Sequence, residues 1–137
     1  MIFPSEGWLQ AVVARVNGHP DLPRALAGLG ADLCAVVEAD PPALRAPFAA
    51  YGRHEGGRIG TVRVLEDVDE VWELEPAYVV RAPYRVWKTL LGGGDPLRAV
   101  LAGRVKVKGN LEQLTRRVSF RYILDGALAT VKTEFAG

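Results

Sequence analysis

The stretch Ala77-Tyr78-Val79-Val80-Arg81-Ala82-Pro83-Tyr84-Arg85-Val86-Trp87-Lys88-Thr89-Leu90-Leu91 changes its hydrophobic periodicity at Pro83. Before the proline, apolar and β-branched residues predict a short strand over 77–81. After it, the apolar residues from Tyr84 to Leu91 recur at the spacing of one helical face, which predicts a helix. Three glycines then end this helix. A strand that leads directly into an amphipathic helix is the pattern from which we derive the fold.

Downstream of the glycines we expect a short helix, a strand and a final helix. Asp95 is a favourable N-cap, Pro96 a favourable first helical residue, and Gly103 ends the short helix. Val105 and Val107 alternate with basic residues, which predicts a strand with one apolar and one basic face. Asn110 caps the final helix, whose apolar face carries Leu111, Leu114, Val118 and Tyr122.

The N-terminal part of the chain predicts two helices. Ser5 is a suitable N-cap, and apolar residues from Trp8 to Val16 share one helical face. Asn17-Gly18 ends this helix, where we expect a residue with a left-handed backbone. A second, short helix is expected over 20–29.

The segment between these helices and residue 77 predicts strands. We expect one strand over 31–39, a hairpin of 51–54 with 58–65, and a further strand over 68–74. Because the connections are too short for helical crossovers, we expect antiparallel pairing. Acidic residues are expected to alternate along a solvated sheet face here: Asp67, Asp69, Glu70, Glu73 and Glu75.

These elements predict an α+β fold in a single domain spanning residues 1–137. We expect an antiparallel sheet of about five strands with the helices packed on one face. The tryptophans Trp8, Trp72 and Trp87 are all expected to pack on that face. Either their side chains fill a closed core, or the helical layer encloses a cavity for an apolar ligand over the sheet.

Composition restricts the class of function. The chain has 17 basic and 16 acidic residues and a net charge of +1, whereas nucleic-acid binders usually show a strong basic excess. We therefore expect no nucleic-acid partner. The N-terminus lacks the basic segment and the long apolar run of a signal peptide, so we expect a cytoplasmic protein. No apolar run is long enough to span a membrane.

No residue pattern predicts a catalytic or metal site. Cys34 lies in an apolar run and is expected to be an inert core thiol. His19 and His54 lie in predicted turns without metal-ligating neighbours, and we expect both to be solvated. The segment Gly92-Gly93-Gly94-Asp95-Pro96 lacks the Gly-Lys-Ser/Thr of a phosphate-binding loop, so we interpret it as a turn. We expect no enzymatic activity, no metal and no cofactor.

Five basic residues predict a local positive patch. The last strand and the final helix can present them together, which suits transient contact with an anionic membrane surface. The alternative is a solvated strand edge, where lysines discourage edge-to-edge pairing. The five residues are Arg104, Lys106, Lys108, Arg116 and Arg117.

The ordered segments resemble the sterol-binding domain family of type-two sterol carrier proteins. The likeness runs through 77–91, Gly94-Asp95-Pro96, Ala99 and 103–110, in the order and spacing of that family. The N-terminal residues 3–38 also look like prokaryotic single-domain members. The resemblance thus covers most of the chain.

This resemblance implies a hydrophobic tunnel between sheet and helices that holds sterols, fatty acyl chains or similar molecules, with no reaction catalysed. We therefore expect the chain to bind a lipid-like molecule, with transfer as a further role. By position, the resemblance places eight residues along the tunnel: Trp87, Leu90, Leu91, Leu101, Val105, Leu114, Val118 and Tyr122.

Two alternative functions stay open. The first is an accessory or scaffold module in a complex, for example in isoprenoid-quinone biosynthesis, which predicts an exposed apolar patch. The second is an enzyme acting on an acyl substrate, which requires polar groups that converge in the pocket. His54 and a carboxylate facing the cavity would favour that enzyme.

Overall fold

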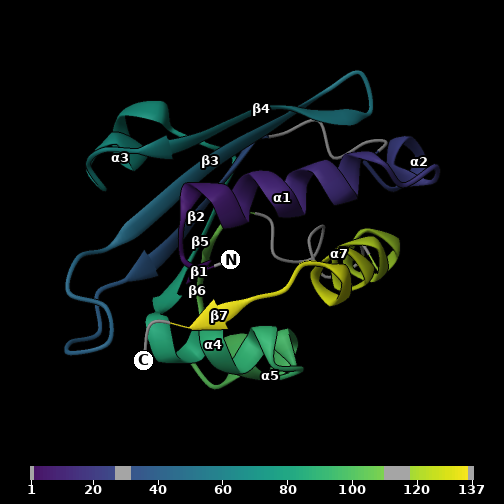
Figure 1. The fold of residues 1–137 in the computed structure, drawn as a ribbon. Coiled ribbons are helices and arrows are strands. Elements are labelled where there is room, and N and C mark those ends of the chain that lie inside the picture. The colour runs from purple at the N-terminus through teal and green to yellow at the C-terminus, as the bar shows by residue number, and fades with distance from the viewer. Residues whose placement is uncertain (1, 27–31, 110–117, 136–137) are drawn as a thin grey trace.

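The computed structural model describes residues 2–26, 32–109 and 118–135. A five-stranded sheet crosses the molecule, and a separate pair of short strands lies near its N- and C-terminal ends (Figure 1). The strands are β1 (Ile2–Phe3), β2 (Asp32–Glu38), β3 (Phe48–Glu55), β4 (Arg58–Leu65), β5 (Tyr78–Pro83), β6 (Lys106–Lys108) and β7 (Glu134–Phe135). The helices are α1 (Glu6–Asn17), α2 (Leu22–Leu26), α3 (Glu70–Leu74), α4 (Tyr84–Leu91), α5 (Pro96–Leu101) and α7 (Val118–Thr130). The α+β class predicted from the sequence is confirmed.

The strand order of the large sheet is β4-β3-β2-β5-β6. The hairpin of β3 and β4 turns at Gly56 and Gly57, whose φ angles of 58° and 79° suit a two-residue hairpin turn. Three of the four strand pairs are antiparallel, as expected, but β2 and β5 are parallel. The prediction is wrong for this pair because β3, β4 and α3 together form the long connection that parallel strands need.

Helices cover the two faces of this sheet unequally. The face that carries Val37 and Ala82, here called the helical face, packs against α1, α2, α4, α5 and α7. The opposite face carries Cys34 and Val36 and packs against α3 alone among the described helices. The expectation of helices on one face is therefore correct except for α3.

Helix α3 replaces the strand that we expected over 68–74. The Glu70 carboxylate accepts hydrogen bonds from the backbone N–H groups of Glu66 and Asp67, at 3.0 and 3.4 Å, at the start of the helix. Val71 is buried against the opposite face, whereas Trp72 is 54% exposed. The expectation that all three tryptophans pack on one sheet face is thus wrong for Trp72. The acidic residues lie on and around a helix rather than along a strand.

Helix α1 forms as predicted from its cap and its apolar face. The Ser5 hydroxyl accepts a hydrogen bond from the Trp8 N–H at 3.2 Å, and Trp8, Val12 and Val16 are buried. Gly18 follows the helix with a φ of −78°, so the expected left-handed residue is absent there. The chain instead turns with right-handed backbone angles, which glycine shares with other residues.

The predicted strand-helix order after residue 77 is confirmed in the described part. Strand β5 leads directly into α4, and Gly93, with a φ of 105°, follows that helix. Val105 and Val107 pack inward, while Lys106 and Lys108 are exposed, which confirms one apolar and one basic strand face. The expected cap Asn110 lies outside the described residues.

Candidate functional site

The indole of Trp87 joins two apolar clusters on the helical face. It packs against the cluster of α1 and α7 and against a second cluster built around Ala82, Ala99 and Val105. Its Nε1–H donates a hydrogen bond to the Val36 carbonyl oxygen at 3.0 Å. Because the polar end of the ring is paired with a central strand, the apolar part is held against both clusters.

The other predicted tunnel residues fall into three groups. Leu90 and Val105 belong to the cluster around Ala82, and Leu91 packs against the cluster of α1 and α7. Leu101 is 76% exposed at the end of α5. The remaining three predictions lie outside what the structure describes. Leu114 is not among the described residues, and for Val118 and Tyr122 only the backbone is described.

An apolar row crosses the helical face through all five strands. Its members are cross-strand neighbours in register: Val64, Ala50, Ala35, Val80 and Val107. Ala50 is buried, but the other four are only half-buried. On the opposite face of the same central strand, Cys34 and Val36 are 0% and 4% exposed. At the centre of the sheet, side chains on the helical face are therefore less buried than those on the opposite face, although more helices pack against the helical face.

Small residues at the middle of the sheet account for this difference. Ala35 and Ala50 stand side by side, and Gly52 follows two residues later on the same face. A Cβ at Gly52 would meet only the Thr61 carbonyl oxygen, at 4.0 Å. Short side chains in the central strands leave room that larger ones would fill.

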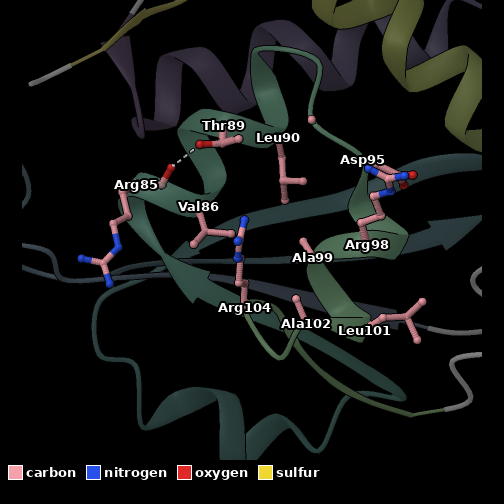
Figure 2. A pocket seen from close by; sticks show the side chains of 11 residues that line it. Arg85, Val86, Thr89, Leu90, Asp95, Arg98, Ala99, Leu101, Ala102 and Arg104 are labelled. Atoms are coloured by element: carbon pink, nitrogen blue, oxygen red, sulfur yellow. Dashed lines mark hydrogen bonds between the residues drawn. The ribbon is translucent and has the colours of Figure 1, made fainter.

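A groove of about 820 Å³ separates α4 from α5 (Figure 2). The less exposed residues in its lining are apolar: Val86, Leu90 and Ala99. The exposed residues in the lining include Arg85, Arg98, Arg104, Asp95 and Leu101. The groove thus combines an apolar base, shared with the cluster around Ala82, with a mainly basic rim.

The predicted basic patch is divided between two surfaces. Arg104 lines the groove between α4 and α5. Lys106 and Lys108 lie on the opposite face of the sheet, where the Lys108 Nζ stands 5.6 Å from the centre of the Trp72 ring. Arg116 and Arg117 lie outside the described residues.

Asp32 ties three strands together at one end of the sheet. Its carboxylate accepts hydrogen bonds from the Tyr51 hydroxyl and the Ala77 N–H, both at 2.8 Å. Burial opposes ionisation, but these hydrogen bonds outweigh it and hold the pKa of Asp32 below its usual value. The bond donated to Asp32 also raises the pKa of Tyr51. This cluster holds β2, β3 and β5 in place.

His54 lies within β3, opposite Ile59, so its place in the predicted hairpin arm is correct and its assignment to a turn is wrong. Both ring nitrogens are buried, and neither has a hydrogen-bond partner in the described part of the chain. The prediction of a solvated His54 is therefore wrong. His19 does lie in a turn, where its Nδ1 accepts a hydrogen bond from the Asp21 N–H at 3.1 Å.

Two further properties of the described residues bear on function. No group of three or more His, Cys, Asp or Glu residues within these ranges is placed to hold a metal ion. Within the same ranges, no helix has both the length and the hydropathy of a transmembrane span.

Several solved structures share the fold of this chain. Neither a protein-family model nor a curated protein sequence matches this chain. Among solved structures, it is similar to the conserved hypothetical protein TT1886 from Thermus thermophilus, a candidate sterol carrier protein. The identity is 23%, the TM-score is 0.75, and the match covers 97% of this chain and 92% of the other.

Two more solved structures share the fold. The crystal structure of sterol carrier protein 2 is 22% identical with a TM-score of 0.72, over 93% of this chain and 98% of the other. The ubiquinone synthesis protein UbiJ-SCP2 is 18% identical with a TM-score of 0.58, over 92% of each chain. The predicted resemblance to type-two sterol carrier proteins is therefore confirmed at the level of the fold.

Proposed function

We propose that this chain binds a sterol, a fatty acyl chain or another lipid-like molecule between the helical face of the sheet and its helices. The observation that carries the proposal is the half-buried apolar row. Ala35 lies in the central strand, yet it stays accessible while its neighbours Cys34 and Val36 are buried. A closely packed layer of helices would bury Ala35, so its accessible side chain supports a space between the sheet and the helices.

The energetics of such a site favour a long apolar ligand. Each CH₂ group removed from water contributes about 0.8 kcal/mol, so an acyl chain can bind tightly without a charged contact. The fold supports the same class of ligand, because two of the similar structures are named as established or candidate sterol carriers. Transfer of the ligand between membranes is the corresponding biological role.

The proposed lining combines the apolar row with the residues predicted from the sequence. Trp87 stands where two clusters meet and is suited to report on occupancy through its fluorescence. The sequence-predicted residues kept in this lining are Trp87, Leu90, Leu91, Val105, Leu114, Val118 and Tyr122, whereas Leu101, at 76% exposure, is assigned to the outer surface.

Native mass spectrometry of the gently purified protein tests the proposal. We expect a co-purifying lipid in the wild-type protein and its loss in Ala35→Phe, because the phenyl ring would occupy the space over the row. Binding of a fluorescent fatty acid should weaken by about 50-fold if the ring displaces roughly three CH₂ groups.

Ala35→Ser is the matched control, since it changes polarity at the same position without filling the space. It should retain most of the binding. Circular dichroism would establish that both variants are folded. A wild-type protein that carries no lipid and binds no probe would refute the proposal, as would a folded Ala35→Phe variant that binds like wild type.

We infer that the bound molecule is not chemically altered. An acyl-processing enzyme would need a polar cluster on the helical face, and His54 is the histidine placed there. Neither His54 nitrogen has a hydrogen-bond partner among the described residues, so the required carboxylate contact is missing from that part. Mass spectrometry of a bound acyl ester before and after prolonged incubation should show an unchanged mass.

An accessory role in a complex is the second candidate. The similarity in fold to the ubiquinone synthesis protein UbiJ-SCP2 favours it, as does the exposure of Ile2 and Phe135 on the small sheet of β1 and β7. This role predicts that Ile2→Ser with Phe135→Ser abolishes co-purification with a partner complex and leaves lipid binding intact. Retained co-purification would count against this surface.

A further inference from the structure

The groove between α4 and α5 concentrates positive charge. Three arginines line it, Arg85, Arg98 and Arg104, against one carboxylate, Asp95. This local excess of two positive charges is larger than the net charge of +1 carried by the whole chain. The positive charge is therefore a property of this surface and not of the protein as a whole.

The arginine charges are available to a partner. Arg98 and Arg104 are exposed and form no ion pair with any residue in the described ranges. Arg85 approaches Asp40 only at 3.9 Å, and its side chain is 78% exposed. Exposed guanidinium groups without a close ion-pair partner bind phosphate and carboxylate groups readily, because they offer two parallel N–H donors.

An apolar side chain stands among these charges. Leu101 is 76% exposed, and it follows Arg98 by three residues on α5, so both side chains lie on neighbouring positions of the helix surface. Figure 2 shows Leu101 at the end of α5 beside Ala102, with Arg104 on the other side of Ala102. A partner that fits this surface has to offer both anionic groups and an apolar region.

We propose that the groove rim formed by Arg98, Leu101 and Arg104 docks on the surface of an anionic phospholipid bilayer. Bilayers present phosphate and carboxylate groups directly above an apolar layer, and shallow insertion of apolar side chains reaches that layer. Nucleic acid offers the phosphates but no apolar region for Leu101. This inference goes beyond ligand binding, because it concerns the surface on which the protein acts.

The basic residues of the proposed docking surface differ from those of the patch predicted from the sequence. Arg104 faces the groove with Arg98, whereas Lys106 and Lys108 lie on the opposite sheet face next to Trp72. The two pairs have the same charge and lie close together in the sequence. They therefore supply a matched comparison between the proposed surface and a neighbouring one.

Vesicle co-sedimentation tests the proposal with the full chain. We expect binding to vesicles of equimolar phosphatidylcholine and phosphatidylserine, weaker binding at high salt, and little binding to phosphatidylcholine alone. Arg98→Gln with Arg104→Gln should weaken binding by about 25-fold, at about fivefold for each cation near the surface. Leu101→Ser should weaken it by about fivefold through loss of apolar insertion.

The control pair Lys106→Gln with Lys108→Gln should bind within about twofold of wild type, since these side chains face away from the bilayer. Equal losses in the two pairs, unchanged binding of Leu101→Ser, or no preference for phosphatidylserine would each overturn the proposal. Thermal melting keeps folding defects apart from docking defects. Lipid content measured by native mass spectrometry is read separately, so failure of ligand binding is distinguishable from failure of docking.

Discussion

Cys34 occupies the most completely buried position of the central strand. It lies between Tyr51 of β3 and Val79 of β5, and its exposure is 0%. Burial and the negative charge of Asp32 raise the pKa of the Cys34 thiol to about 11, although Arg63 acts in the other direction. The expected burial of Cys34 in the core is thus confirmed, and its inertness stays a prediction.

This burial predicts that the stability of the protein falls at alkaline pH. Below pH 9 the thiol is protonated in the folded and the unfolded chain, so its contribution to stability is complete. Between pH 9 and about 11 the unfolded chain loses the proton and the folded chain keeps it. The free energy of unfolding should fall by about 1.4 kcal/mol per pH unit across this window.

Urea denaturation over a pH series measures the effect. Cys34→Ala lacks the thiol, so its stability should decline less steeply across the same window, whatever its absolute value. Identical pH slopes in the two proteins would contradict the prediction.

Sequence alone could place single residues only where a local pattern decides. Ser5 as a cap and Cys34 as a core thiol follow from their neighbours in the chain. His54 does not, because its burial depends on which helices and loops cover the hairpin end. Local patterns do not predict the cluster of arginines in the groove either, because Arg85, Arg98 and Arg104 come together only when α4 packs beside α5.

At the scale of elements, α1 is fastened to the edge strand β4 through one side chain. The Asn17 amide donates to the Ile59 carbonyl oxygen at 3.0 Å and accepts from the Ile59 N–H at 2.8 Å. It pairs with the backbone of β4 as a neighbouring strand would. The amide therefore satisfies edge groups that would otherwise be open to another chain.

Removing this pairing should loosen the hairpin from the helices. Asn17→Ala is expected to lower the free energy of unfolding by about 2 kcal/mol, because two backbone groups lose their partners. Asn17→Asp keeps the acceptor and loses the donor, so it should lie between Asn17→Ala and wild type. Chemical denaturation ranks the three proteins, and a stability of Asn17→Ala equal to wild type would show that the amide contributes nothing.

Helix α3 shows why one element is assigned wrongly from the sequence. Val68, Val71 and Leu74 all pack against the opposite face, and their spacing of three fits a helical turn. In so short a segment, the alternation of acidic and apolar residues favours a strand instead. The signal that distinguishes the two is Glu70, three residues after Asp67, because an acidic side chain placed to accept from the preceding backbone marks a helix start.

At the scale of the molecule, Phe3 connects segments from both ends of the described chain. Its ring lies 4.8 Å from Trp8, 6.0 Å from Tyr84 and 6.2 Å from Phe135, measured between ring centres. Phe3 also pairs with Phe135 through the parallel strands β1 and β7. The Trp8 indole N–H donates to the Thr133 hydroxyl at 2.9 Å and reinforces the same junction.

Phe3→Ala should therefore destabilise the whole fold, by about 3 to 5 kcal/mol, since the ring is 3% exposed and its loss leaves a cavity. Phe135→Ala is the control from the same strand pair, and its effect should be much smaller because Phe135 is 37% exposed. Thermal unfolding of the two variants compares them. Equal shifts would mean that the junction does not depend on Phe3.

The sequence predicted the class of fold and the order of most elements, because these follow from periodicity and capping. It did not predict the parallel pairing of β2 with β5. The connection between these strands consists of the hairpin of β3 and β4 and the short helix α3, and no local pattern marks these elements as one crossover. The candidate site shares this limit. Trp87 could be identified from its position after β5, whereas the apolar row depends on the register of five strands.

The parallel pair also has a consequence for how the protein is made. Asp32 and Ala77 are 45 residues apart, so β2 leaves the ribosome well before its partner β5. The hairpin of β3 and β4 can pair with one side of β2 at once, but the other side stays an open strand edge during synthesis. Newly made chains that stop before Tyr78 should therefore aggregate or bind chaperones, and only the arrival of β5 turns this edge into the middle of a sheet.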